Sequence, residues 1–365
     1  MYIYESHEWP NFTWDDKRLI NLLSIVRNLQ GRLIGQMEAI GFSLRGEAIL
    51  GTLTTDVVKS SLIEGEVLNT EEVRSSIARK LGMDVAGLVP SKRKVDGIVE
   101  MMLDATQNYH QELTKQRLFN WHSALFTTGR SGMYKIIVGS WRKDIKGPMQ
   151  VVSGPAGKEK IHYEAPEAEK LEDEMARFLE WFNREHQIEP VIKSGIAHLW
   201  FVTIHPFEDG NGRIARAIGD MQLARAEKTN QRFYSLSDQT EHDKKSYYEI
   251  LESTQKGTLD VTNWLLWYLE SLTKALNRTE ESLANVLVKA NFWKKHSATI
   301  LNQRQHKMIN KLLDDFYGEL TTSKWAKINK CSQDTALRDI QDLLNKSILM
   351  KEPGGGRSTS YAFIK

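Results

Sequence analysis

The chain has 365 residues, a length that predicts two or three compact domains with separate hydrophobic cores. Its 49 lysines and arginines nearly balance its 47 aspartates and glutamates, and the net charge of +2 excludes binding to nucleic acid or membranes through overall charge. The single cysteine, Cys331, excludes an internal disulfide and a zinc site built from cysteines. Because the start does not resemble a leader and no run of about 18 apolar residues occurs, we expect a cytoplasmic protein that makes no membrane contact.

Amphipathic helices are predicted along most of the chain up to about residue 290, because apolar residues recur there at intervals of three and four. We therefore expect a mainly α-helical fold. The predicted helices span residues 16–42, 48–64, 71–80, 92–109, 114–128, 165–186, 190–204, 212–227, 243–256 and 258–290.

One segment, residues 147–166, departs from the helical pattern. Its sequence GPMQVVSGPAGKEKIHYEAP has glycine and proline near its ends and a Gly-Pro turn between MQVV and KIHYE. This arrangement predicts a β-hairpin within a helical protein. The residues alone leave open whether the hairpin has a function or is a surface decoration.

The C-terminal segment, residues 305–365, has a different pattern from the rest. Two short helices joined by a turn and a third amphipathic helix, which begins at Ser332 with a capping pattern, are predicted first. A strand ILMKE, a glycine-rich tip and a second strand SYAFI follow. This order is typical of a winged helix-turn-helix, with the third helix as recognition helix and EPGGGRST as the wing.

The sequence leaves DNA contact through this segment open. Basic residues of the third helix and the wing are candidates for phosphate contacts, namely Arg338, Lys346 and Arg357. Acidic residues of the same helix make it a poor electrostatic surface for DNA, namely Asp334, Asp339 and Asp342. The alternative is a surface that docks protein.

The sequence HPFEDGNGRIAR, which starts at residue 205, places many polar groups on a short turn that leads into a helix. The first N–H groups of a helix lack partners and the helix dipole is positive there, so such an end binds anions. Gly210 and Gly212 let the backbone approach a ligand closely, and Asn211 supplies an amide donor. Arg213 and Arg216 add two cations, so the turn fits a polyphosphate.

Other side chains of this turn suit catalysis. Asp209 is placed beside the bound phosphates, where it can hold Mg²⁺, which takes one or two carboxylates in addition to phosphate oxygens and water. His205 can be neutral near pH 7 and take a proton from an incoming hydroxyl. Phe207, between these polar residues, is expected to anchor the loop in the core.

Eight positions of the turn match the pattern H-x-F-x-[D/E]-G-N-G-R-x-x-R without a departure, namely His205, Phe207, Asp209, Gly210, Asn211, Gly212, Arg213 and Arg216. The chain thereby resembles the Fic family, whose members mostly transfer AMP from ATP to a hydroxyl of a target protein. The resemblance implies a Fic helical bundle, with ATP as co-substrate and Mg²⁺ as cofactor. It also implies three parts: an N-terminal helical region at 1–110, a catalytic core at 111–290 and a winged helix-turn-helix domain at 291–365.

The resemblance also gives a role to the hairpin and to two tyrosines. The hairpin at 147–166 is similar to the Fic flap, which pairs with the backbone of a target protein and aligns its Ser, Thr or Tyr hydroxyl. The preceding GSWRKD resembles the segment that leads into the flap in relatives. Tyr247 and Tyr248 resemble adenine-side residues of such proteins, although their helical spacing also fits a place in the core.

A second motif, SSLIEG, lies at residues 60–65. Gly65 is placed to end the preceding helix, so Glu64 lies in the last turn, where the helix dipole makes a carboxylate unfavourable. Ser60 and Glu64 share one helix face and match the inhibitory pattern [S/T]-x-x-x-E-[G/N] of Fic proteins. The resemblance implies an inhibitory helix at about 48–65, in which Glu64 pairs with Arg216 and restrains ATP binding. The alternative is an exposed glutamate beside an ordinary glycine cap.

The function expected from the sequence is therefore that of a protein adenylyltransferase inhibited by its own Glu64. Two alternatives stay open. Glu64 can instead orient a water that removes AMP from a modified target, or the protein can act as a DNA-binding regulator through residues 305–365. The sequence also leaves open the target protein, the modified residue type and the formation of a homodimer.

Overall fold

The structure is a computed structural model of the chain. It describes residues 1–39, 42–84, 87–145, 147–154, 158–185, 187–296, 299–313, 316, 318–352 and 359–364. Within these residues the chain forms two compact units, Met1–Thr279 and Glu280–Lys365. No helix in the described ranges combines the length and apolar character that crossing a membrane requires.

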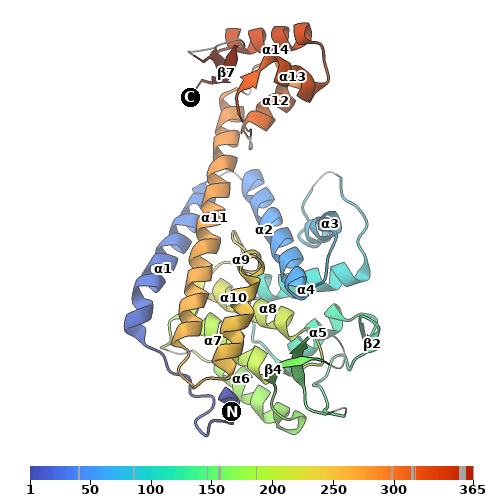
Figure 1. Cartoon of the computed structure of the whole chain (residues 1–365), viewed down its shortest axis with the longest axis vertical. Helices are drawn as coiled ribbons and strands as arrows, with labels where there is room; N and C mark the ends of the chain where they lie inside the picture. The colour runs from blue at the N-terminus through green and yellow to red at the C-terminus, as the bar shows by residue number, and fades with distance from the viewer. Residues whose placement is uncertain are drawn as a thin grey trace. The chain divides into compact units, whose positions relative to one another are not determined.

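The first unit is mainly helical, which confirms the fold class predicted from the sequence (Figure 1). Its α-helices are α1 (Asp16–Ala39), α2 (Phe42–Ile63), α3 (Thr70–Lys80), α4 (Arg93–Gln107), α5 (Lys115–Leu125), α6 (Leu171–Asn183), α7 (Pro190–Ile204), α8 (Asn211–Glu227), α9 (Leu236–His242), α10 (Lys244–Gln255) and the first part of α11 (Thr262–Lys295). Two short 3₁₀ helices are η1 (Ile3–Glu5) and η2 (Ala168–Lys170). Two antiparallel hairpins are formed by β1 (Arg130–Ser131) with β2 (Tyr134–Lys135) and by β3 (Gln150–Ser153) with β4 (Lys160–Glu164).

Helix α7 is the buried centre of the first unit, because every residue from Val191 to Ile204 is buried. It begins at Pro190, whose fixed φ suits a first helical position. The Glu189 side chain accepts hydrogen bonds from the first free N–H groups of the helix at 2.7 and 3.1 Å. Helix α8 packs along α7. The turn that joins them is therefore fixed at both ends by buried helices.

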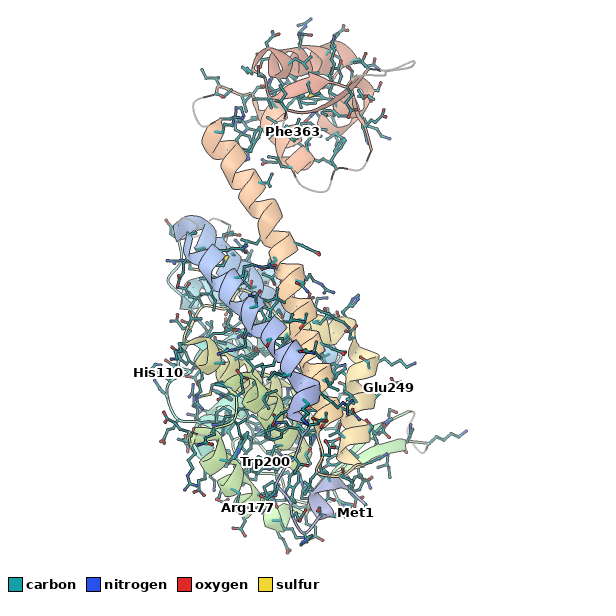
Figure 2. All side chains as sticks on the ribbon, turned by 90° about the vertical axis from the view of Figure 1, so that its left-hand side faces the viewer. Met1, His110, Arg177, Trp200, Glu249 and Phe363 are labelled. Carbon is teal, nitrogen blue, oxygen red and sulfur yellow. The ribbon has the colours of Figure 1, made fainter. Side chains whose placement is uncertain are left out.

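Aromatic rings fill the core around α7. The ring of Trp200, which is labelled in Figure 2, lies 5.7 Å from Phe12 and 5.5 Å from Phe178, centroid to centroid. Other residues labelled there are exposed on the first unit, namely His110, Arg177 and Glu249. His110 is thus a surface residue.

Some elements differ from the predicted ones. Helix α9 was not predicted, because seven residues are too few to display a helical period. The β1–β2 hairpin was not predicted either, since strands of two residues show no alternation. Helix α2 begins at Phe42 rather than at 48. Gly46 lies inside it, and a Cβ at this position would lie 3.3 Å from Cε of Met83, so the close approach of Met83 favours glycine here despite its low helix propensity.

The second unit contains three helices and three strands among its described residues, besides the end of α11. In chain order these are α12 (Gln303–Leu313), β5 (Leu320–Thr321), α13 (Thr322–Asn329), α14 (Gln333–Asn345), β6 (Leu349–Lys351) and β7 (Ser360–Phe363). The strands form an antiparallel sheet in the order β5-β7-β6. Its core contains the fully buried Trp325 and Ile340. The wing at 353–358 and Arg357 lie outside the described residues, and the winged helix-turn-helix assignment stays a prediction.

Candidate active site

The motif histidine lies at the turn between α7 and α8. His205 ends α7 in the left-handed conformation, with φ of 52°, which is uncommon for a residue other than glycine. Its Nδ1 lies 3.1 Å from the carbonyl oxygen of Val202, so Nδ1 carries the hydrogen and Nε2 keeps its lone pair. Burial lowers the pKa of His205 to about 4, so the ring is neutral at pH 7. The residue is therefore in the protonation state that a general base requires.

A buried arginine fixes the position of this histidine. The Nε of Arg142 donates to the carbonyl oxygen of His205 at 2.8 Å, and its backbone N–H donates to that of Pro206 at 2.9 Å. The guanidinium also donates to the carbonyl oxygen of Pro166, just beyond β4, and to the carboxylate of Asp144. Arg142 thus ties the motif turn to the base of the β3–β4 hairpin. The segment GSWRKD was expected to lead into the hairpin only through family resemblance, and no role of Arg142 was predicted.

The turn between the helices is closed by a reciprocal pair of hydrogen bonds. The Asn211 side chain accepts from the Phe207 N–H at 3.0 Å and donates to the Phe207 carbonyl at 2.8 Å. Phe207 is fully buried, as the anchoring prediction requires. Because the Asn211 amide is engaged in this way, its predicted donation to a phosphate stays a proposal.

His122 packs against the same turn, a role that the sequence did not predict. Its ring stacks on that of Phe207 at 4.2 Å between centroids. Its Nδ1 accepts from the Gly139 N–H at 3.2 Å, so Nε2 carries the hydrogen and donates to the Asp209 carbonyl at 3.2 Å. Burial lowers the pKa of His122 to about 4 and keeps the ring neutral. No local pattern marks this residue, because its partners lie far along the chain.

The start of α8 already holds a carboxylate of the protein itself. Gly210 precedes the helix with φ of 84°, and a Cβ there would lie 2.9 Å from the Phe126 ring. A Cβ on Gly212 would lie 2.2 Å from Oε1 of Glu64. Glu64 therefore lies against the helix N-terminus, where the sequence predicts an anion.

Arg216 is held by the end of α2. Its Nη2 donates to Oε1 of Glu64 and to the carbonyl oxygen of Ser60, both at 2.8 Å, and its Nε donates to the Ser60 hydroxyl at 2.9 Å. Helix α2 ends at Ile63, and Gly65 follows with φ of 79°. Burial opposes the charge of Arg216, but the Glu64 carboxylate holds its pKa above the ordinary value. The contact expected between Glu64 and Arg216 is thus present, and Ser60 takes part in it.

Arg213 has a different partner, which the sequence did not predict. Its Nη1 donates to Oε2 of Glu66 at 2.8 Å. Its guanidinium lies over the Phe126 ring at 5.1 Å. The Arg213 side chain is only 5% exposed, so both motif arginines are buried and paired with acids of the turn after α2.

The carboxylate of Asp209 lies in the motif turn, and both of its oxygens accept hydrogen bonds. Its Oδ1 accepts from the Gly210 N–H at 2.5 Å, and its Oδ2 accepts from the Ser131 hydroxyl in the β1–β2 hairpin. No group of three or more His, Cys, Asp or Glu able to hold a metal occurs among the described residues. Mg²⁺ binding at Asp209, together with phosphate oxygens and water, stays a prediction from the sequence.

The family of this region follows from its sequence match. Residues 112–223 match the model of the Fic/DOC family, and this range includes the whole motif turn. The chain contains a Fic/DOC family domain. Residues 2–83, which carry Glu64 and Glu66, match a separate model described as a domain of unknown function (DUF4172).

Curated relatives of the Fic domain are named protein adenylyltransferase Fic. The relative from Drosophila yakuba is 32% identical over 117 residues, which are 29% of this chain and 24% of the relative. The relative from Drosophila melanogaster is 31% identical over 117 residues, with the same shares. The chain thus matches about a quarter of the length of these relatives.

Solved structures share the fold. A Fic family protein from Desulfovibrio desulfuricans has a TM-score of 0.56 at 19% identity, over 97% of this chain and 98% of that chain. A Fic domain containing signaling protein from Bacteroides thetaiotaomicron has a TM-score of 0.50 at 20% identity, over 72% of this chain and 93% of that chain. These TM-scores show a shared fold.

The β3–β4 hairpin of the Fic domain is anchored at its base. The Tyr163 hydroxyl donates to the carbonyl oxygen of Thr203 in α7 at 2.6 Å. Farther along the hairpin, His162 lies 2.6 Å from the Ser153 hydroxyl and 2.6 Å from the carboxylate of Glu252 in α10. His162 thus joins the hairpin to α10. The turn at 155–157 lies outside the described residues.

The two tyrosines of α10 occupy different environments. Tyr247 is 2% exposed, and its hydroxyl lies 2.9 Å from Nε2 of His198. Tyr248 is 38% exposed, and its hydroxyl donates to the carbonyl oxygen of Ile63 at 3.3 Å. Burial of Tyr247 favours its place in the core, while Tyr248 lies beside the end of α2. Adenine binding by either residue stays a prediction.

Proposed function

We propose that this protein transfers AMP from ATP to a hydroxyl of a target protein. One observation carries the proposal: His205, whose Nδ1 is engaged by the Val202 carbonyl, ends α7 just before the N-terminus of α8, which carries two buried arginines. One nitrogen of these two arginines, Nη1 of Arg216, is buried and makes no hydrogen bond among the described residues. A buried, unsatisfied cationic donor beside an anion site is what an incoming phosphate would satisfy.

The proposed step is a displacement at the α-phosphorus of ATP. The target oxygen forms a bond to phosphorus, the bond from phosphorus to the bridging oxygen breaks, and pyrophosphate leaves. The target proton goes to Nε2 of His205. Arg213, Arg216 and the first N–H groups of α8 would take the negative charge of the phosphates. Held at Asp209 and the phosphates, Mg²⁺ would neutralise part of that charge.

The β3–β4 hairpin is our candidate for target docking. Its two strands pair only with each other among the described residues, so an edge is open to a further strand. Val152 and Ile161 are 47% and 45% exposed on it, and such apolar side chains suit contact with a peptide. Arg142 would keep this hairpin in a fixed position relative to His205.

Glu64 is proposed to inhibit the reaction. Its carboxylate lies at Gly212 and pairs with Arg216, so it competes with phosphate for both the helix end and the cation. Displacing it has to precede productive ATP binding. A cytoplasmic location and a homodimer stay predictions from the sequence.

Removal of AMP from a modified target is a second candidate function of this site, because Glu64 lies close to the proposed base His205. The Glu64 charge acts on the pKa of His205, although burial of the ring outweighs it. A carboxylate at this place can orient a water toward a bound AMP ester. Pre-modified target separates the two functions: AMP release that needs Glu64 favours removal, and release independent of Glu64 contradicts it.

The direct test of transfer uses labelled ATP and three proteins: the wild type, Glu64→Gly, and Glu64→Gly combined with His205→Ala. We expect more self-labelling by Glu64→Gly than by the wild type, because Arg216 becomes available. The double variant should bind Mg·ATP in calorimetry and transfer no label. If Glu64→Gly gives no binding heat with Mg·ATP, the proposal is wrong.

A DNA-binding function of the second unit is favoured by the orientation of α14. The carboxylate of Asp339 accepts from Nε of Arg304 at 2.7 Å, and that of Asp342 accepts from Gln305 at 2.7 Å. These acids therefore face partners within the unit. The exposed face of α14 carries Asp334, Leu337, Arg338, Gln341 and Asn345. Arginine and amide side chains of this kind pair with base edges.

DNA binding by the second unit has a simple test. The amino group of Lys346 donates to the carbonyl oxygen of Ile300 at 2.8 Å, which leaves Arg338 as the better contact. Binding of the full chain to duplex DNA is measured at several salt concentrations, with Arg338→Ala and with Lys311→Ala on α12 as control. We expect binding that weakens with salt and with Arg338→Ala. A response that is flat in salt contradicts DNA binding.

A further inference from the structure

Glu66 forms a buried ion pair that the inhibitory motif does not explain. Its Oε2 accepts from Nη1 of Arg213 at 2.8 Å, and its side chain is 18% exposed. The Nε of Arg213 is buried and makes no hydrogen bond among the described residues, so Glu66 supplies most of the visible compensation for this cation. The Phe126 ring closes one face of the guanidinium. A phosphate that comes to Arg213 has to take over the place of Glu66.

The two acids of this turn are held in one conformation. The Gly65 N–H donates to the carbonyl oxygen of Leu62 at 2.9 Å, and the Glu66 N–H donates to that of Ser61 at 3.0 Å. Together with the positive φ of Gly65, these bonds fix the chain where it leaves α2. Glu64 then reaches Arg216, and Glu66 reaches Arg213. The same short turn therefore neutralises both cations of the motif.

We infer that Glu66 is a second restraining residue, which holds Arg213 away from phosphate as Glu64 holds Arg216; this rests on the proposed ATP site. The carboxylate carries the charge that a phosphate carries, and the two anions repel each other at one guanidinium. Removing Glu64 alone leaves Arg213 paired. Full access to both arginines requires the release of both acids.

Lys94 is the alternative partner of the released Glu66. Its Nζ lies 2.7 Å from the other carboxylate oxygen, Oε1, and its side chain is 55% exposed. Glu66 lies between Lys94 on α4 and Arg213 on α8, with one oxygen toward each. When phosphate takes Arg213, the carboxylate keeps a cation at Lys94 rather than becoming an unpaired charge. Lys94 thus favours ATP binding without contact with ATP.

Calorimetry with Mg·ATP tests this inference, in proteins that also carry His205→Ala so that no turnover occurs. In a Glu64→Gly background, adding Glu66→Gln should tighten Mg·ATP binding about tenfold. The reason is that ATP no longer has to break the charge-assisted hydrogen bond between Glu66 and Arg213. Adding Lys94→Met instead should weaken binding, since Glu66 then stays on Arg213. With Glu66→Gln present, Lys94→Met should have no effect. Glu71→Gln, an exposed charge on α3, is the matched control and should leave affinity unchanged.

The outcomes separate this inference from the proposed function. If Glu64→Gly with His205→Ala binds no Mg·ATP, the ATP site itself is wrong. If that protein binds and Glu66→Gln leaves affinity equal or weaker, Glu66 does not restrain Arg213 and the inference is wrong. Thermal unfolding without ATP checks each fold, and if Glu66→Gln does not fold, Lys94→Met in the Glu64→Gly background decides alone: unchanged or tighter binding contradicts the inference.

Discussion

Replacing Glu64 by Gln is the sharpest single perturbation of this site. The substitution keeps the size of the side chain and an oxygen that accepts from Arg216, and it removes only the negative charge. In the wild type that charge lies 2.8 Å from a guanidinium whose side chain is 5% exposed. The apo state therefore loses a favourable charge interaction, while the ATP-bound state loses a repulsion.

The magnitude follows from the kind of bond that is weakened. A hydrogen bond between charged groups contributes about 1.5–3 kcal/mol to stability. Glu64 is 31% exposed, so solvent weakens the bond and the low end of this range applies. Each 1.4 kcal/mol corresponds to a factor of about ten in affinity. We expect Mg·ATP to bind Glu64→Gln about tenfold more tightly than the wild type.

Isothermal titration calorimetry measures this difference directly, and thermal unfolding provides an independent measurement. Without ATP the variant should unfold at a lower temperature than the wild type, because Arg216 loses its charged partner. With saturating Mg·ATP the difference should shrink, since binding stabilises the folded state. Glu47→Gln, which removes the exposed pair with Arg74, is the control and should change neither affinity nor the effect of ATP. Equal affinity of wild type and Glu64→Gln would refute the reasoning.

Three further predictions concern the architecture of the turn. In a Glu64→Gly background, Gly212→Ala should weaken Mg·ATP binding in calorimetry, because the new methyl group occupies the place of the Glu64 carboxylate at the helix end. The control Gly219→Ala, whose Cβ makes only ordinary contacts, should leave Mg·ATP binding unchanged. Arg142→Ala should lower the transfer rate about a hundredfold in a labelling assay, with little change in ATP affinity, because His205 loses its register with the hairpin; a rate within twofold of the parent contradicts this. His122 should lower the free energy of unfolding by about 3 kcal/mol as the pH drops from about 6.5 to 4. In this range His122 takes up a proton in the unfolded chain, whereas in the folded protein burial lowers its pKa to about 4 and the ring stays neutral. Urea unfolding over this pH range should therefore show a smaller loss of unfolding free energy for His122→Phe than for the wild type. An equal loss in the two proteins would count against this prediction.

The local features of this protein could be predicted from its sequence because they depend on residues close together in the chain. The 3.6-residue period predicts the helices, and α7 occupies the predicted range. Glycine and proline mark the hairpin, whose strands β3 and β4 lie within the predicted segment. The twelve residues of the turn predict an anion site at the start of α8. Short elements such as α9 and β1–β2 were missed because they contain too few residues for a period to be seen.

Only the tertiary structure decided which distant groups meet at that turn. The spacing of residues along α2 and α8 carries no information about contact between them, and the pairing of Glu64 with Arg216 was expected only through family resemblance. The pairing of Glu66 with Arg213 and the place of His122 under Phe207 had no signal in the sequence. Likewise, Asp339 faces inward to Arg304, which the sequence of one helix does not reveal. Such pairings form because packing buries the charged groups together, and a buried charge then requires a partner from whichever element lies beside it.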